Sequence, residues 1–380
     1  MAFSLSTVAQ TLSSLISSKE GSVIGIDIGA SAIKIVQLRA SHGVAILETY
    51  GEIALGPYAK VPIGKATKLS PEQLAQALLD LMKEANVTAR KGGISIPFSA
   101  SLISILDLPK VDAKQLARMI PLEARKYIPV PTDEVKLDWF VIPQEEEGGA
   151  FDRVVAKPAS PVKGQEVLLV AIHNETLNNY EIITKTAGCA IDFFEIEIFS
   201  AIRSSLGHGI APVLVVDLGA STTKIYIAER GIIRLSHLLT SGGMNMTETL
   251  AHSLNWEFEK AERVKRERGL ISSTTYSQDE NEKIKTALLS TLSRVFSEVN
   301  RVLLSYGQRY NKHVSHVVLT GGGASLPGLK DAAHELLNAE VEIANPFART
   351  EAPAFLAEVL RDIGPGFAVA IGLALRNLKH

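Results

Sequence analysis

A nine-residue sequence occurs twice in this chain, as DIGASAIKI over residues 27–35 and as DLGASTTKI over residues 217–225. Six of the nine positions are identical, a seventh pairs Ile with Leu, and the copies begin 190 residues apart. In each copy an apolar run leads into an Asp-x-Gly turn and a second apolar stretch follows, which predicts a strand, a tight turn and a return strand. Either copy alone could be an ordinary hairpin turn. Because a hairpin turn has no reason to recur with the same residues, the repeat predicts two related halves.

Length and composition agree with two lobes. A chain of 380 residues exceeds what one hydrophobic core usually holds, so two domains are expected. The net charge of −2 provides no positive excess to attract a phosphate backbone, so we expect no nucleic-acid partner. The single cysteine, Cys189, excludes an internal disulfide. The longest apolar runs, 167–172 and 213–216, are far shorter than the roughly 18 residues of a membrane span.

The N-terminal arm, residues 1–22, carries apolar side chains at helical spacing: Leu5, Val8, Leu12, Leu15 and Ile16. No Lys or Arg precedes them, and Ser and Thr interrupt the apolar run, so a signal peptide is disfavoured. Two interpretations stay open. The arm is either mobile or packed on the body, or it is a docking helix for a partner or a membrane surface.

Several local patterns predict secondary structure. Ser70-Pro71 marks the start of a helix, and Gly188 marks the end of another. Residues 113–131 form a helical pattern that contains Pro121, which predicts a kink or a break. Residues 145–163 mix acidic residues with Gly and Pro and predict an exposed loop. A helical block from 246 to about 310 is interrupted by the polar segment 272–281.

The repeated turns have the chemistry of a phosphate clamp. Glycine lets the backbone approach a ligand, the N–H groups point inward, and Ser or Thr hydroxyls add donors. An Asp at the end of the strand would repel phosphate but suits a hydrated Mg²⁺. We therefore predict Asp27 and Asp217 as magnesium anchors through water. The predicted contacts to the β- and γ-phosphates are Gly29, Ser31 and Lys34 from the first turn and Gly219, Ser221, Thr222 and Thr223 from the second. In the alternative, Thr223 and Lys224 simply alternate across a strand.

A third glycine cluster, TGGGASLPGL over residues 320–329, follows an apolar strand and precedes a helix. Bare glycines let a nucleoside lie against the backbone, and a helix N-terminus follows for phosphate. We predict Gly321, Gly322, Gly323 and Ser325 as the nucleoside bed, with a packing role as the alternative. The sequence has neither GxGxxG nor GxxxxGK[ST], so the Rossmann and P-loop interpretations lose support.

The order of these three segments resembles the actin-like ATPase superfamily. DIGASAIK is similar to its first phosphate motif, DLGASTTK to its second and VVLTGGGASLPGL to its adenosine motif. The resemblance implies an α/β actin-like ATPase fold: two ribonuclease-H-like lobes, with ATP or ADP and Mg²⁺ in the cleft between them.

Further segments resemble one family, the type IV pilus assembly protein PilM. They are GIDIGASAIKIVQL (25–38), EARKYIPVPTDEVKLDW (123–139), VEIANPF (341–347) and GPGFAVAIGLALR (364–376), so the resemblance covers about 23–376. The long N-terminal arm departs from the family. The implied organisation is a first lobe (23–95), an inserted 1C-type subdomain like that of FtsA (96–188), an interlobe connection (189–210) and a second lobe (211–380). The last helix would return toward the first lobe.

The resemblance also implies a function. Members of this family are cytoplasmic ATP-binding scaffolds at the inner face of the inner membrane, with slow or no ATP hydrolysis. They bind the N-terminal cytoplasmic tail of PilN in a groove between the inserted subdomain and the first lobe, and through PilN they join a PilN–PilO complex. The resemblance leaves the pilus ATPases open as further partners.

Three more residue roles come from the resemblance. Glu262 and Lys265 lie three residues apart in a segment that contacts ribose and adenine in the superfamily; the alternative is a solvated charged helix. Glu197 falls where relatives place a residue near the attacking water, which would make Glu197, Asp27 and Asp217 the catalytic set. It could equally be a surface glutamate at a helix start. Because no HExxH and no close-set His pair occurs, we expect no zinc site.

Two other functions compete on the same fold. A small-molecule kinase needs an additional general-base Asp after the first phosphate motif, and none is evident. A filament protein like FtsA usually ends in a linker and an amphipathic membrane helix, whereas this sequence ends in ALRNLKH.

Overall fold

The computed structural model describes residues 21–143, 164–207, 209–337 and 339–378. Its first five-stranded sheet begins with an antiparallel meander, to which two parallel strands are added beside β1. In spatial order the strands are β3 (Val44–Ala54), β2 (Ala32–Ser41), β1 (Ser22–Ile28), β4 (Lys91–Ile96) and β8 (Ala190–Ile196).

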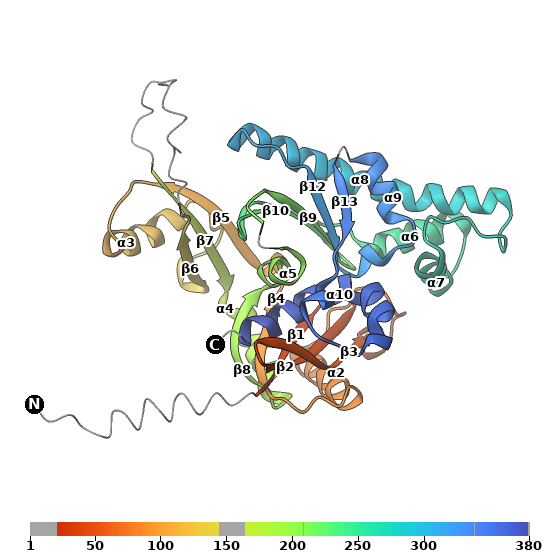
Figure 1. The fold of residues 1–380 in the computed structure, drawn as a ribbon, viewed down its shortest axis with the longest axis horizontal. Coiled ribbons are helices and arrows are strands. Elements are labelled where there is room, and N and C mark those ends of the chain that lie inside the picture. The colour runs from red at the N-terminus through yellow and green to blue at the C-terminus, as the bar shows by residue number, and fades with distance from the viewer. Residues whose placement is uncertain (1–20, 144–163, 208, 338, 379–380) are drawn as a thin grey trace, which may run out of the picture.

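The second five-stranded sheet repeats this topology. In spatial order its strands are β11 (Ile232–Leu239), β10 (Thr223–Glu229), β9 (Val213–Leu218), β12 (His316–Thr320) and β13 (Glu340–Ile343). Again the first three strands are antiparallel and the last two run parallel to the central one. The two related halves predicted from the repeat are therefore confirmed, and they lie on either side of the molecule's centre in Figure 1.

Helices cover both sheets. The first lobe carries η1 (Gly56–Ala59), α2 (Pro71–Glu84) and α4 (Asn174–Thr186). The second carries α6 (Gly243–Leu254), α7 (Phe258–Arg268), α8 (Gln278–Tyr310) and α9 (Leu329–Leu336), with η4 (Gly322–Ser325) at the glycine cluster. The predicted start of α2 is confirmed: the Ser70 hydroxyl accepts the Gln73 N–H, and the Gln73 side chain accepts the Ser70 N–H. Gly188 follows α4 with φ of 68°, as expected of a glycine after a helix end.

The inserted subdomain is a small antiparallel sheet covered by one helix. Its strands are β5 (Ser101–Leu108), β7 (Gln165–His173) and β6 (Val135–Val141) in spatial order; η2 (Phe98–Ala100) precedes them and η3 (Thr132–Glu134) leads into β6. Helix α3 (Ala113–Ala124) buries Leu116 and Ile120 against Val167 and Leu169 of the sheet. The helix includes Pro121 in its last turn and ends at Ala124, so the predicted break falls after the proline. The exposed loop expected at 145–163 and residues 1–20 of the arm lie outside the described residues.

Two segments take part in the first lobe although the expected boundaries place them elsewhere. Helix α4, expected within the inserted subdomain, packs on α2 and buries Ile183 in the first-lobe core. Strand β8, expected in the interlobe connection, pairs in parallel with β4. Both placements follow from burial, because the apolar face of α4 must be buried against another element and the open edge of β4 must pair with a strand.

Two helices lie where the lobes meet: α5 (Glu197–Ser205) and α10 (Ala357–Asn377), with η5 (Pro346–Arg349) and η6 (Ala354–Leu356) before α10. A Cβ on Gly372 of α10 would lie 1.9 Å from the Ser200 carbonyl oxygen of α5. A Cβ on Gly25 of β1 would lie 1.9 Å from the Ala370 carbonyl oxygen. These glycines let α10 pack directly on α5 and on the first sheet.

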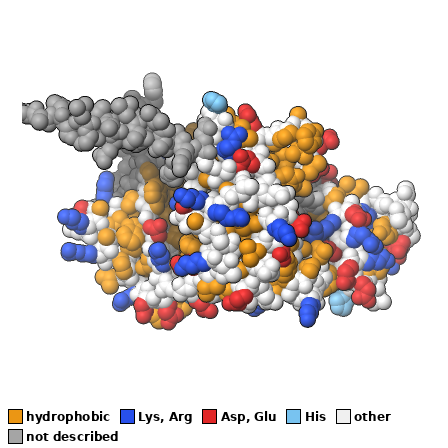
Figure 2. Space-filling view, turned by 90° about the horizontal axis from the view of Figure 1, so that it is seen from below, with side chains coloured by type: hydrophobic (Ala, Val, Ile, Leu, Met, Phe, Trp, Pro, Cys, Tyr) orange, Lys and Arg blue, Asp and Glu red, His pale blue; other side chains and the backbone are white. Residues whose placement is uncertain are grey.

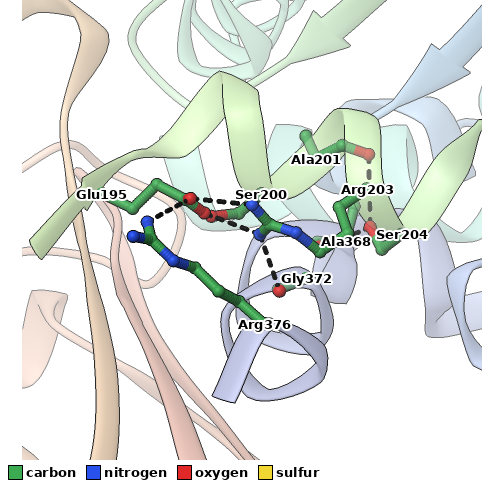
Figure 3. Close-up of polar contacts among 8 residues, drawn as sticks. All are labelled: Glu195, Ser200, Ala201, Arg203, Ser204, Ala368, Gly372 and Arg376. Carbon is green, nitrogen blue, oxygen red and sulfur yellow. Dashed lines mark hydrogen bonds and ion pairs between the residues drawn. The ribbon is translucent and has the colours of Figure 1, made fainter. Parts of the chain in front are cut away.

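Polar contacts reinforce this packing (Figure 3). The buried Glu195 carboxylate accepts from Arg203 of α5 at 2.7 and 2.8 Å and from Arg376 of α10 at 2.6 Å. Arg203 also donates to the Gly372 carbonyl oxygen at 2.9 Å, and the Ser204 hydroxyl donates to that of Ala368 at 2.6 Å. The last helix is thus fixed to the first lobe.

The face shown in Figure 2 carries positive and negative side chains interspersed among apolar ones. Among the described residues, no helix is both long enough and apolar enough to cross a membrane.

Candidate nucleotide-binding cleft

The repeated sequence forms the same structure in both lobes. The Gly29 N–H donates to the Ala32 carbonyl oxygen at 2.9 Å, and the Gly219 N–H donates to that of Thr222 at 3.0 Å. Asp27 lies directly opposite Lys34 in the β1–β2 ladder, as Asp217 lies opposite Lys224 in the β9–β10 ladder. Directly opposed residues point to the same face of a sheet. Each turn therefore presents an Asp and a Lys side by side.

Both turns line one cavity of about 690 Å³, within the range of small-molecule sites. Fifteen of the sixteen predicted site residues line it. From the first lobe these are Asp27, Gly29, Ser31, Lys34 and Glu197; from the second they are Asp217, Gly219, Ser221, Thr222, Glu262, Lys265, Gly321, Gly322, Gly323 and Ser325. Segments far apart in the sequence thus meet in one cleft.

Thr223 is the exception. Its side chain is fully buried, and its hydroxyl donates to the Ser241 carbonyl oxygen at 2.8 Å. Successive strand residues point to opposite faces, so Thr223 faces away from the cavity that Lys224 lines. The expectation that Thr223 contacts phosphate is not met, and strand alternation describes this pair.

The glycine cluster is shaped by contact with the second turn. Gly321 has φ of 81°, and a Cβ there would lie 2.3 Å from Asp217 Oδ1. A Cβ on Gly323 would lie 2.8 Å from that of Leu218, whereas one on Gly322 would meet nothing within 4 Å. Packing against the Asp217 strand therefore requires two of these glycines, and the third faces open space.

Asp27 is half-buried at the end of β1, directly before the first turn. The Ser95 hydroxyl of β4 donates to Asp27 Oδ1 at 2.8 Å. Burial raises the pKa of Asp27, and the charge of Lys34 and the hydrogen bond from Ser95 oppose that rise. No sequence pattern points to Ser95, because it becomes a neighbour of Asp27 only through the parallel pairing of β1 with β4.

Lys224 connects the two lobes at the floor of the cleft. Its Nζ lies 2.8 Å from Glu197 Oε2 and 3.3 Å from Asp217 Oδ2. Burial lowers the pKa of Lys224, but the carboxylates of Asp217 and Glu197 outweigh burial, so the pKa is raised. Burial raises the pKa of Glu197; Lys224 opposes this, while Asp217 and Asp27 add to it. The sequence gives no sign of this role for Lys224, because its partner Glu197 follows the last strand of the other sheet.

Glu262 and Lys265 form the far wall of the cleft. Lys265 Nζ lies 2.6 Å from Glu262 Oε2, and Arg266 Nε lies 2.5 Å from Glu262 Oε1. Burial raises the pKa of Glu262, but Lys265 is the main group that lowers it below its usual value. Gly64 of the first lobe approaches closely, since a Cβ there would lie 2.6 Å from the Glu262 carboxylate. Glu262 and Lys265 therefore form a largely buried ion pair that lines the cavity, and they do not belong to a solvated helix face.

The donor set fits a phosphate chain with its magnesium. Among the described residues, no group of three or more His, Cys, Asp or Glu could hold a metal ion alone. Mg²⁺ commonly takes one or two carboxylates together with phosphate oxygens and water, and Asp27 and Asp217 are the carboxylates that the two repeated turns contribute to the cavity. Lys34 supplies positive charge: it lies 6.0 Å from the Phe367 ring centroid and has no ion pair within the described residues.

Two lobes of shared topology, with matching phosphate-type turns on either side of a cleft, define this chain as a protein of the actin-like ATPase fold. The structure of MreB5 of Spiroplasma citri bound to AMPPNP has this fold. The match covers 94% of this chain and 97% of the MreB5 chain, with a TM-score of 0.52 at 14% identity. A family model described as type IV pilus assembly protein PilM matches residues 25–378, so the chain belongs to the PilM family.

Other relatives agree with this placement. A structure described as the PilM–PilN type IV pilus biogenesis complex matches with a TM-score of 0.77 at 25% identity. The match covers 94% of this chain and 99% of the chain in that structure. The cell division protein FtsA of Rhizobium meliloti is 29% identical over 178 residues, which is 42% of this chain. The chain spans only 39% of that relative's length.

Proposed function

We propose that this chain is an ATP-binding scaffold of type IV pilus assembly that binds the N-terminal tail of PilN and hydrolyses ATP slowly or not at all. The observation that carries the proposal is the match to the solved PilM–PilN complex, at a TM-score of 0.77 over 99% of that chain. The family model over 25–378 supports the same role.

The proposed PilN site is a groove whose lining residues all belong to segment 96–188, the expected inserted subdomain. It has a volume of about 150 Å³. Its lining is formed by Ser99, Ala100, Ser101, Leu102, Ile128, Pro129, Val130, Val135, Ala171 and His173. The lining is mostly small or apolar and offers one imidazole. Such a groove suits an extended peptide that inserts short apolar side chains.

The nucleotide has a structural role in this proposal. A ligand held by both phosphate turns favours the arrangement in which the lobes face each other, because it binds that arrangement best. Asp27 and Asp217 would hold magnesium through water, and Lys34 would neutralise phosphate charge. The glycine cluster with Glu262 and Lys265 would hold the nucleoside.

The proposed location is the cytoplasmic face of the inner membrane, reached through PilN and the PilN–PilO complex. The family match supports this placement. The pilus ATPases are further proposed partners at that site.

The test combines the identity of the bound nucleotide with peptide binding. Nucleotide released by denaturing the purified protein is identified by mass. Calorimetry then compares a PilN tail peptide, a scrambled peptide and an FtsZ tail peptide. We expect adenine nucleotide and binding of the PilN peptide alone. Binding of the FtsZ tail would favour the FtsA-like function, and ADP release that depends on an added sugar would favour a kinase.

A further inference from the structure

Lys224 and Lys34 occupy equivalent positions in the two repeats but have different partners. Each lies opposite the Asp of its own turn. Lys34 has no ion pair within the described residues and lies beside the Phe367 ring. Lys224 contacts two carboxylates, Asp217 and Glu197. The duplicated lysine is therefore paired with two carboxylates in the second lobe, whereas in the first lobe it has no ion pair within the described residues.

The contact between Lys224 and Glu197 crosses from one lobe to the other. Lys224 lies on β10 of the second sheet, and Glu197 begins α5 directly after β8 of the first sheet. About a tenth of each side chain is exposed, so water screens the pair weakly. A pair of this kind holds its geometry more firmly than a surface ion pair does.

Both carboxylate oxygens of Glu197 are engaged. Oε2 accepts from Lys224 Nζ at 2.8 Å, and Oε1 accepts from the Phe98 N–H at 2.7 Å. A general base for ATP hydrolysis must point a lone pair at the attacking water and accept its proton. Of the charged groups facing Glu197, Lys224 favours the ionised form, whereas Asp217 and Asp27 favour the protonated one. Lys224 therefore orients this carboxylate, and it occupies the oxygen that the Phe98 N–H leaves open.

We propose that Lys224 is a resident counter-cation that holds Glu197 in a cross-lobe ion pair and thereby keeps ATP turnover slow. The inference rests on the proposed nucleotide binding. In the suppressed reaction, the water oxygen bonds to the γ-phosphorus and the bond from that phosphorus to the bridging oxygen breaks. The water proton passes to the Glu197 carboxylate and then to solvent, leaving ADP and inorganic phosphate. Lys224 is a positioning residue, because it acts through Glu197.

The test compares Lys224→Met, Lys224→Arg and the double variant Lys224→Met with Glu197→Gln. Each is measured for ATP affinity by calorimetry, for phosphate release and for thermal unfolding without nucleotide. We expect Lys224→Met to raise phosphate release at least tenfold while ATP affinity changes less. Lys224→Arg keeps the charge and should give a smaller rise. The double variant should lose the rise, because the base is gone. Without nucleotide, Lys224→Met should unfold at lower temperature than the natural protein.

A control at the equivalent position separates charge removal in general from loss of this pair. Lys34→Met should weaken ATP affinity without raising phosphate release. The proposal fails if Lys224→Met binds ATP and releases phosphate at the natural rate. If Lys224→Met does not fold, Lys224→Gln is used, and failure of both to fold would assign a purely structural role and overturn it. If the natural protein binds no ATP, the proposed function fails first and this inference falls with it.

Discussion

Glu197 Oε1 accepts a hydrogen bond from the backbone N–H of Phe98 at 2.7 Å. Phe98 begins η2, and the next residue, Ser99, lines both the cavity between the lobes and the proposed PilN groove. A carboxylate at the floor of the cleft therefore holds the backbone that forms one end of the groove. A substitution of Glu197 therefore removes a hydrogen bond that holds the backbone of the proposed PilN groove.

The first prediction concerns this hydrogen bond. Glu197→Ala leaves a half-buried N–H without its acceptor, which costs about 1–3 kcal/mol of stability. Because the affected backbone belongs to the groove, we expect calorimetry to show binding of the PilN tail peptide weakened at least threefold. Glu181→Ala is the control, since Glu181 is exposed and its ion pair in the described part of the chain is with Lys185, one turn along α4. Equal peptide affinities for both variants would show that the groove is independent of Glu197.

The second prediction compares two ion pairs that join the second lobe to the inserted subdomain. Arg234 Nη1 lies 2.7 Å from Glu166 Oε2, and its Nε lies 3.2 Å from the buried Glu229. Arg309 lies 3.6 Å from Asp107, and the side chains of Arg309 and Asp107 are 41% and 74% exposed. We expect Arg234→Ala to lower the free energy of unfolding by about 3 kcal/mol and Arg309→Ala by less than about 1 kcal/mol. Denaturant unfolding measures both, and similar losses would contradict the difference in burial.

The two repeated turns could be predicted from sequence because everything that forms them is local. Nine residues specify the strand, the turn and the return strand, and a second copy specifies the other lobe. The capping of α2 and the interruption between α7 and α8 were predictable for the same reason.

Contacts between distant segments could not be predicted in this way. Lys224 and Glu197 are brought together only by the packing of the two lobes, and Ser95 meets Asp27 only through a parallel strand pair. The phosphate role of Thr223 failed because the motif suggests a hydroxyl donor, whereas strand alternation decides where the hydroxyl points. The roles of Gly25 and Gly372 likewise depend on how closely α10 approaches elements that are remote in sequence.

The third prediction uses Gly372. Helix propensity alone predicts that Gly→Ala within a helix stabilises by up to about 1 kcal/mol. In α10 the new Cβ would lie 1.9 Å from the Ser200 carbonyl oxygen, which is backbone and cannot turn aside. Gly372→Ala should therefore destabilise by about 1–3 kcal/mol or more. Gly307→Ala in α8 is the matched control, because its nearest contact would be an ordinary 3.6 Å. We expect the unfolding temperature to fall in Gly372→Ala and to rise in Gly307→Ala. Stabilisation of both variants would exclude tight packing of α10 on α5.

The fourth prediction concerns nucleotide binding. Asp217 is the buried carboxylate of the second turn, and it lines the cavity beside Lys224. We expect Asp217→Ala to weaken ATP affinity at least tenfold, or about 1.4 kcal/mol, in calorimetry with Mg²⁺. Binding of the PilN tail peptide should weaken less than threefold, since the groove is affected only indirectly. The exposed Asp331 of α9 provides the control Asp331→Ala, and unchanged ATP affinity in Asp217→Ala would remove the second turn from the site.

The fifth prediction separates function from stability at Asp27. Burial raises the pKa of this carboxyl above its ordinary value of 3.8, against the opposing effects of Lys34 and Ser95. An acid whose folded pKa exceeds its unfolded pKa holds more protons when folded, so stability falls as pH rises from 3.8 through the folded value. At any pH above the folded pKa of Asp27, the full loss of folding stability remains. The ionised carboxylate suits magnesium and phosphate chemistry and thus costs stability in the empty cleft.

Asp27→Asn removes the charge and keeps an oxygen that can accept from the Ser95 hydroxyl. At pH 7 without nucleotide, the variant should therefore unfold at a higher temperature than the natural protein, although it binds ATP more weakly. The difference in unfolding temperature should shrink as the pH is lowered toward 3.8, where the natural carboxyl is protonated as well. Asp133→Asn, at an exposed position in η3, should show no such trend. An Asp27→Asn variant less stable at pH 7, or a difference that does not vary with pH, would show that the ionised carboxylate stabilises the cleft.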